Sequence, residues 1–434
     1  MTGKRHKFQL VRITFLNAGV SLPKRKMNNK DREILRPLAS RWMEIASQPV
    51  MEDRKRQWTA LKDLHAERPM ILFETWTLDN YVAESELQCE DQSFRGIERN
   101  MRWVIRHAEE VGDDIVIEPC WRIGWHVGGT GYGVDIRSHH ATDITGGTTG
   151  YAFENPIQMP SDIDKLTPRT WHVDRDGTKK WKERLEETFG DIMPVILHGT
   201  TGLGGGLTGD VFRLMGNDRL MTWVYDEPDA IHRVMTYLRD DRIAYFDFLE
   251  KEELFGLNNN STLVGSGSPG FTTALPQPDY SGKARPKDLW LDMESQETTA
   301  ISPKMFGEFF LPYMADICKR FGLIYYGCCE PVHDRWDRII KLIPNVRAIS
   351  ISPWCDMKLI AAELGRNCVF SRKPRPAPIS GVNPDWNMLQ KDIKDTLEAA
   401  KDCNLEIIFR DVYRINNDLP RLRKWADMVR AEIG

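Results

Sequence analysis

The sequence lacks a long hydrophobic run, a block of basic charge and a disulfide pattern. No apolar stretch approaches the roughly 18 residues that a membrane-spanning helix needs, so we expect no membrane partner. Acidic and basic side chains are interspersed and give a net charge of -4, which argues against nucleic-acid binding. With 434 residues and 41% hydrophobic content, the chain can form one large domain or two ordinary ones.

The eight cysteines are spread along the chain without the spacing of a disulfide framework. Reduced thiols of this kind are typical of a cytoplasmic protein. The N-terminus is basic, but polar residues interrupt the apolar segment 8–20, which therefore makes a poor signal peptide. Translation is expected to start at Met1 or at Met27, and in the second case residues 1–26 are an upstream extension.

Eight short apolar segments, separated by helical sequence, predict a closed parallel (β/α)8 barrel, the TIM-barrel fold. The segments are residues 70–73, 115–117, 195–197, 289–291, 323–326, 346–351, 368–370 and 406–409. In such a barrel the carboxyl ends of all strands meet at one face. An open doubly wound sheet is the alternative, and it would place a ligand at a switch point in the sheet.

The chain is predicted to divide into an N-terminal helical extension, residues 1–67, and the barrel, residues 68–434. The extension is charged and has helical periodicity, and we expect Pro37 to break it into two helices. Two stretches, residues 122–190 and 254–287, are too long for ordinary connections. Both are expected to fold over the mouth of the barrel.

Two thiols and a carboxylate follow the fifth predicted strand, where the sequence reads GCCE and the residues are Cys328, Cys329 and Glu330. The carboxyl ends of strands are where α/β proteins carry their chemistry. Thiolate and carboxylate together suit a zinc-type ion. A thiolate is alternatively a nucleophile, and two core thiols beside a surface glutamate are the third interpretation. In an extended chain the two sulfurs point to opposite sides.

Ionisable and aromatic residues also follow the other predicted strands. We expect carboxylates and one imidazole to transfer or orient protons: Glu74, Glu118, His198, Asp292 and Glu330. Other side chains are expected to form apolar or polar walls for a substrate, and these are Trp76, Trp121, Trp125, Trp354 and Gln296. For each of the tryptophans, core packing is the alternative. Cations after the last two strands are expected to hold a substrate anion, with an ion-pair network as the alternative: Arg372, Lys373 and Arg410.

A glycine-rich segment, residues 202–206, follows the third predicted strand and permits close approach of a ligand to the backbone. It does not match a dinucleotide fingerprint, and the glycines of residues 128–133 contain no phosphate-loop pattern. The sequence therefore predicts no nucleotide cofactor.

Residues 301–314, ISPKMFGEFFLPYM, resemble the segment after the fourth barrel strand in the uroporphyrinogen decarboxylase superfamily. Ile301-Ser302-Pro303, Phe306 and Phe310-Leu311-Pro312-Tyr313 carry the resemblance, which is best over residues 285–434. The fold of that superfamily is the (β/α)8 barrel. Besides the decarboxylases, it contains corrinoid-dependent methyltransferases that act on methanol, methylamines, methyl thiols and aryl methyl ethers.

The two branches of the superfamily differ in their motifs. The decarboxylases carry an N-terminal Arg-Gln-Ala-Gly-Arg motif, which this sequence does not contain. The methyltransferases bind zinc through His-x-Cys after the fifth strand and a third cysteine after the eighth. Cys328 matches that cysteine, whereas Tyr326 stands at the histidine position and no cysteine stands near Asp411. Nearby substitutes for the missing ligands are Cys329, Glu330, His333 and Cys355.

The resemblance implies a methyltransferase of the corrinoid-dependent type. It would move a methyl group from a small O-, N- or S-methyl compound to a corrinoid carried by a separate protein, with zinc as a further cofactor. A lyase that acts on a carboxylated substrate is the first alternative, and a non-catalytic binding barrel is the second. A homodimer is a further expectation that the sequence leaves open.

Overall fold

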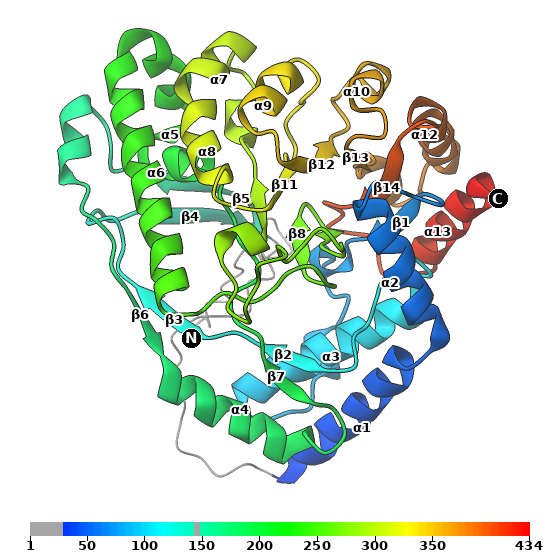
Figure 1. Ribbon diagram of the computed structural model, residues 1–434. Coiled ribbons are helices and arrows are strands. Elements are labelled where there is room, and N and C mark those ends of the chain that lie inside the picture. Colours follow the sequence, from blue (N-terminus) through cyan, green and yellow to red (C-terminus); the bar gives the residue numbers. More distant parts are fainter. Residues whose placement is uncertain (1–28, 143–147) are drawn as a thin grey trace.

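The computed structural model describes residues 29–142 and 148–434, so the expectation about the start of the chain lies outside the described residues. Its centre is a parallel sheet of six strands (Figure 1). In spatial order the strands are β1 (Met70–Phe73), β14 (Asn404–Phe409), β13 (Val369–Arg372), β12 (Val346–Ile351), β11 (Leu323–Tyr326) and β10 (Trp290–Met293). Six of the eight predicted strands are therefore confirmed in this sheet.

A second, two-stranded parallel sheet joins β2 (Trp121–Ile123) to β7 (Val195–Leu197). The strand predicted at residues 195–197 is confirmed as β7, just as the strand predicted at 70–73 is confirmed as β1. The prediction of a strand at residues 115–117 is wrong. There the Ile115 N–H donates to the Asp113 carboxylate at 3.2 Å and the Ile117 N–H donates to the Met51 sulfur at 3.4 Å. These side chains take the place of a neighbouring strand.

Individual hydrogen bonds, rather than ladders, connect the two parallel sheets. The Asp114 N–H donates to the Ile71 carbonyl at 2.9 Å on one side. On the other side the Gly205 N–H donates to the Asp292 carbonyl at 2.7 Å, and the Asp292 N–H donates to Leu203 at 2.9 Å. The fold is mixed α/β, but within the described residues continuous strand pairing does not run around an eight-stranded barrel.

Helices cover the outer side of the strands (Figure 1). The helices that follow β1 are α3 (Gln92–Glu110), α4 (Arg175–Phe189), α5 (Thr208–Asp226), α6 (Pro228–Lys251), α7 (Pro303–Phe309), α8 (Leu311–Cys318), α9 (Trp336–Leu342), α10 (Met357–Leu364), α11 (Ala377–Ser380), α12 (Trp386–Ala399) and α13 (Pro420–Ile433). In the part of the chain that the structure describes, no helix is both long and apolar enough to cross a membrane.

The N-terminal helices are α1 (Asn29–Ala46) and α2 (Pro49–Lys62). Pro37 lies inside α1, so the predicted break at this residue is wrong. The proline costs the helix about 3 kcal/mol, but the residues on either side, Leu35 and Ala39, are fully buried in a cluster with Phe94 of α3. This burial offsets the cost, and the chain breaks after Ala46 instead.

The insert of residues 122–190 contains two pairs of antiparallel strands. One pairs β3 (His126–Gly129) with β6 (Trp171–Asp174), and the other pairs β4 (Arg137–Thr142) with β5 (Thr148–Glu154). The insert packs on the outer helices: the rings of Trp171 and Tyr245 of α6 lie 5.3 Å apart, and Arg169 forms an ion pair with Asp241 of α6. The insert therefore packs against an outer helix, whereas the sequence predicted that it folds over the mouth of the barrel.

The second long connection enters the interior of the ring of strands. Its hairpin pairs β8 (Leu263–Gly265) with β9 (Ser268–Pro269), and β8 lies within the ring in Figure 1. Val264 belongs to a buried cluster with Met70 and Tyr325, whose side chains face inward. A Cβ at Gly265 would lie 2.2 Å from a ring carbon of Tyr325, so only glycine fits. The prediction that residues 254–287 cover the mouth of the barrel is therefore wrong, because their hairpin lies in the interior.

A buried ion pair connects the N-terminal helices to this interior. Lys62, the last residue of α2, places Nζ 2.7 Å from Oε2 of Glu406 in β14, and neither side chain is exposed to solvent. Lys62 also donates to the Ser268 hydroxyl of the hairpin. Burial lowers the pKa of Lys62, and Glu406 opposes that shift. The division into an extension and a barrel stays a prediction, but this contact crosses its boundary.

We predict that Lys62→Met destabilises the protein by about 3–5 kcal/mol, because it leaves the Glu406 carboxylate buried without an opposite charge. Lys55→Met is the matched control, since Lys55 on the same helix pairs with the exposed Glu52 and such pairs contribute about 0–1 kcal/mol. The free energy of unfolding in urea measures both. Equal stabilities of the two variants would contradict the prediction.

Candidate functional site

Six ionisable side chains gather at the carboxyl ends of β1, β11, β13 and β14, and we refer to them as the mouth cluster. Its members are Glu74, Cys328, Cys329, Lys373, Arg410 and Asp411. Each one follows the end of a strand directly or after a short turn, and the parallel direction of the four strands brings these ends to one face. The sequence identified five of the six as site candidates.

Glu74 and Arg410 form the centre of the mouth cluster. The Glu74 N–H continues the β1–β14 ladder by donating to Phe409 at 2.7 Å, which fixes the two side chains next to each other. Arg410 Nε lies 3.4 Å from Glu74 Oε2 and 3.5 Å from Asp411 Oδ2. Glu74 is only 3% exposed. Burial raises the pKa of its carboxyl, although Arg410 opposes the shift.

Cys328 and Cys329 face each other because the chain is not extended there, the conformation in which the sequence would place them on opposite sides. Gly327 has φ +94° and ends the extended chain, and the Cys328 N–H donates to Glu330 at 2.9 Å in the turn that follows. The two sulfurs lie 3.7 Å apart as free thiols. The hydrogen bond from Cys328 lowers the pKa of Cys329, and the same bond raises the pKa of Cys328.

Charged groups approach both thiols. Arg410 Nη1 lies 3.8 Å from the Cys328 sulfur, and the Cys329 sulfur lies 4.0 Å from Asp411 Oδ2. A guanidinium favours a thiolate nearby, and a carboxylate disfavours one. These neighbouring charges taken alone favour a thiolate at Cys328, whereas the hydrogen bond from Cys328 acts in the opposite direction and lowers the pKa of Cys329.

Lys373 is a buried amine without an ion-pair partner among the described residues. It is 3% exposed, and its Nζ donates to the Ser371 hydroxyl at 2.6 Å. The ring centroid of Tyr325 lies 5.6 Å from Nζ, and the Tyr325 hydroxyl donates to Ser371 at 2.8 Å. Burial lowers the pKa of Lys373 to about 7. The amine is thus divided between its charged and neutral forms near neutral pH.

The predicted metal ligands beyond the two thiols are turned away from them. Glu330 is fully buried, and its carboxylate accepts hydrogen bonds from the backbone of Ser295 at 2.8 Å and of Cys328 at 2.9 Å. His333 Nδ1 accepts from the Asp356 N–H at 3.3 Å. The Cys355 sulfur accepts from the Val332 N–H at 3.4 Å. Local backbone groups therefore hold all three of these side chains.

Within residues 29–142 and 148–434, no three or more His, Cys, Asp or Glu side chains lie close enough together to hold a metal ion. The arrangement of Cys328, Cys329, Glu330, His333 and Cys355 does not fit the zinc site that the sequence suggested.

Glu118 and His198 lie in a separate group at the ends of β2 and β7. Glu118 forms an ion pair with Arg122 and accepts a hydrogen bond from Ser261. Burial alone would raise the pKa of Glu118, but the hydrogen bond from Arg122 lowers it. His198 Nε2 donates to the Leu257 carbonyl at 2.7 Å, and burial lowers its pKa. These contacts hold both side chains among their own neighbours rather than in the mouth cluster.

One of the four predicted wall tryptophans lies near the mouth cluster. A Cβ on Gly267, next to Glu74, would lie 3.9 Å from the Trp76 ring. Trp121 packs edge-on against Trp42 at 5.7 Å, and Trp125 lies 5.0 Å from the Arg175 guanidinium. Trp354 follows β12 and is 63% exposed, and its role as a wall stays a prediction.

Arg372 differs from its predicted role, whereas the roles of Asp292 and Gln296 stay predictions. Arg372 points outward to α12, where it donates to Asp392 at 2.6 Å, so it does not hold a substrate anion. Asp292 is half-buried and pairs through its backbone with Gly204. The Gln296 amide donates to Glu297 at 3.3 Å. Strand alternation explains the first case, because Ser371 and Lys373 face inward and Arg372 between them does not.

Sequence reasoning missed two buried carboxylates near the site. Glu406 is the third residue of β14 and faces the same side as Ile408 and Arg410, so its place two and four residues before them could have identified it. Glu294 is 8% exposed, and burial, with Glu297 and Glu330 nearby, raises its pKa. Its position directly after β10 could have identified Glu294, whereas the sequence-based prediction is Asp292, two residues earlier.

Comparison with known proteins gives a weak likeness to solved structures. No protein-family model matches the chain, and no curated protein matches it. One of the solved structures that match is a methyltransferase from Methanosarcina mazei, with 10% identity and a TM-score of 0.36. The match covers 58% of this chain and 63% of that protein. A likeness at this level does not establish a shared activity, and the resemblance to the uroporphyrinogen decarboxylase superfamily stays a hypothesis.

We predict that iodoacetamide alkylates Cys329 with an apparent pKa below the ordinary thiol value of about 8.5. In Cys328→Ala the apparent pKa of Cys329 should rise, because the variant removes the hydrogen bond that stabilises the thiolate. Fragment-ion mass spectrometry after timed alkylation at several pH values measures the rate at each residue. An unchanged pH profile in Cys328→Ala would refute the assignment of this hydrogen bond.

Proposed function

We propose that this chain is a methyltransferase whose catalytic site is the mouth cluster. Its substrate would be a small O-, N- or S-methyl compound. The observation that supports the proposal is the buried Glu74 carboxyl, which burial keeps protonated to a higher pH than usual, beside a pair of thiols and two cations. This combination provides an acid in a site from which water is largely excluded.

Methyl transfer requires activation of the leaving group. An alkoxide or amide ion leaves poorly, so the heteroatom must be protonated as its bond to the methyl carbon breaks. Glu74 is the group that would supply this proton, and Arg410 at 3.4 Å would stabilise the carboxylate that remains.

Arg410 and Lys373 would orient a substrate that carries an anionic group, such as a carboxylate or a phenolate. Arg410 is charged throughout the physiological range, whereas Lys373 loses its charge around its pKa of about 7. An anionic substrate should therefore bind less tightly as the pH rises through neutrality. Trp76 would exclude water from one side.

The methyl acceptor in this proposal is a corrinoid carried by a separate protein. The corrinoid would supply the cobalt that takes the methyl group, and this chain would supply the acid and the walls. The partner follows from the sequence resemblance alone, so the first assay should use a free reduced corrinoid as the acceptor.

A lyase that removes carbon dioxide from a small carboxylic acid is the second candidate. Arg410 and Lys373 beside Glu74 are the observation that favours it, because two cations would hold the carboxylate and the acid would protonate the resulting carbanion. Arg372 faces outward, which leaves one arginine in the cluster and favours a substrate with few carboxylates.

We expect Glu74→Gln to lower kcat for methyl transfer by about 10²–10⁴, the usual contribution of a general acid. The wild-type kcat should fall as the pH rises through the raised pKa of Glu74, and the variant should lose this dependence. Glu398→Gln is the control, because Glu398 is exposed and pairs only with Lys401. The assay follows demethylation of methoxyaryl, methylamine and methyl thiol compounds.

Either of two results would count against the proposal: Glu74→Gln could be as active as the wild type, or the wild type could release carbon dioxide from carboxylic acids while no methyl compound reacts. The second result would establish the lyase instead. Circular dichroism and thermal melting of both variants separate a loss of chemistry from a loss of folding.

A further inference from the structure

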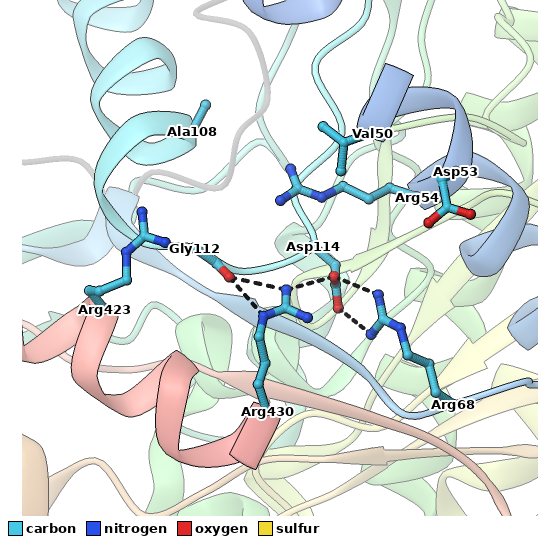
Figure 2. A pocket seen from close by; sticks show the side chains of 9 residues that line it. All are labelled: Val50, Asp53, Arg54, Arg68, Ala108, Gly112, Asp114, Arg423 and Arg430. Atoms are coloured by element: carbon cyan, nitrogen blue, oxygen red, sulfur yellow. Dashed lines mark hydrogen bonds and ion pairs between the residues drawn. The ribbon is translucent and has the colours of Figure 1, made fainter. Parts of the chain in front are cut away.

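A cavity of about 290 Å³ lies between α2, the end of α3 and α13, and none of its lining residues belongs to the mouth cluster. Four arginines line it, and Figure 2 shows them around Gly112 and Asp114. They come from three parts of the chain: Arg54 from α2, Arg68 from the segment before β1, and Arg423 and Arg430 from α13. We refer to this space as the arginine cavity.

The carboxylates at the arginine cavity are already engaged. Asp114 accepts two hydrogen bonds from Arg68, at 2.9 and 3.0 Å, and one from Arg430 at 2.9 Å. Asp53 turns to its own helix, where it accepts from Arg56 at 3.0 Å and from Gln57 at 2.7 Å. Asp114 therefore pairs with two of the four guanidinium groups, and Asp53 accepts hydrogen bonds from side chains that do not line the cavity.

The other two arginines bind only main-chain oxygens. Arg54 Nη1 donates to the Ile115 carbonyl at 2.8 Å. Arg423 donates through Nε to Glu110 at 3.0 Å and through Nη2 to Glu109 at 2.8 Å. Neither forms an ion pair with a carboxylate in the described part of the chain. Carbonyl oxygens satisfy some of the N–H donors, but they do not neutralise the two positive charges.

Electrostatics also indicates that the positive charge of Arg54 is not neutralised. Burial lowers its pKa, and the neighbouring Arg68 and Arg430 add to that effect while Asp113 and Asp114 oppose it. A guanidinium whose charged form is disfavoured in this way gains stability from any anion that enters the cavity.

We propose that the arginine cavity binds a small phosphate-type oxyanion, either inorganic phosphate or the phosphate group of a small metabolite. The planar guanidinium matches the oxygens of phosphate in a two-point contact, and arginine is the residue that proteins favour for this purpose. Ligand pockets usually measure about 300–1,000 Å³, so the cavity volume favours a small ligand. The carbonyls that would repel an anion already accept hydrogen bonds: those of Glu109 and Glu110 at the end of α3 from Arg423, and that of Gly112 from Arg430.

The experiment is calorimetric titration of the full chain with inorganic phosphate at low ionic strength. The wild type should bind in a saturable manner, Arg54→Gln and Arg423→Gln should each weaken the affinity at least tenfold, and added salt should weaken it as well. Arg338→Gln is the matched control, because Arg338 is exposed on α9 and far from the cavity lining. Its affinity should equal that of the wild type.

A parallel titration with glycerol 3-phosphate distinguishes the two sources of the anion: tighter binding than that of phosphate indicates a metabolite, and equal or weaker binding indicates the free ion. Melting without phosphate identifies any variant that fails to fold, and Arg54→Lys, which keeps the charge but loses the two-point contact, replaces such a variant. The absence of saturable heat in the wild type would overturn the proposal. So would wild-type affinity in the Arg54→Gln/Arg423→Gln double variant.

Discussion

A charged side chain inside the ring of strands must either meet an opposite charge or lose its own, because apolar side chains there replace most of the water. Lys62 and Glu406 meet each other at 2.7 Å without exposure. Lys373 forms no ion pair among the described residues, and although Glu406 raises its pKa, the neighbouring cations Arg410 and Lys62 lower it. The low pKa of Lys373 thus follows from how the interior charges are divided, as well as from its burial.

The same constraint shapes the rest of the mouth cluster. Glu74 and Arg410 share a partly compensated contact at 3.4 Å, so the carboxyl keeps a raised pKa beside a permanent cation. The two sulfurs lie 3.7 Å apart, and the hydrogen bond between them raises the pKa of Cys328 and lowers that of Cys329. Acid, amine and thiol therefore all titrate away from their ordinary values within one group of side chains, and such groups occur at functional sites more often than elsewhere in a protein.

Local patterns predicted the strands well. Short apolar runs identified the six strands of the central sheet and β7, because a strand buried on both faces must be apolar along its length. The run at residues 115–117 failed because apolar content cannot reveal that Asp113 and Met51 would take the backbone N–H groups there. The residues that carried the family resemblance, such as Phe306 and Phe310, are fully buried core residues, so they report packing rather than substrate.

The site was predictable in position but not in detail. Placing chemistry at strand ends located Glu74, Cys328, Cys329, Lys373 and Arg410 correctly. The orientation of Glu330 depends on a turn that points two backbone N–H groups at its carboxylate, and sequence spacing does not encode that geometry. The separation of Arg372 from Lys373 was available from strand alternation, whereas the capture of Lys62 by β14 joins residues 344 positions apart and has no local signal.

The hairpin of β8 and β9 gives the site a floor. Its tip, Gly267, has φ +81°, and a Cβ there would come 2.9 Å from a methyl group of Ile408 and 3.5 Å from the Glu74 carboxylate. The depth of the space above the strands is thus set by a connecting segment and not by the strands themselves. A longer or shorter hairpin would change the size of molecule that reaches Glu74 while the sheet, the thiol pair and the acid stayed where they are.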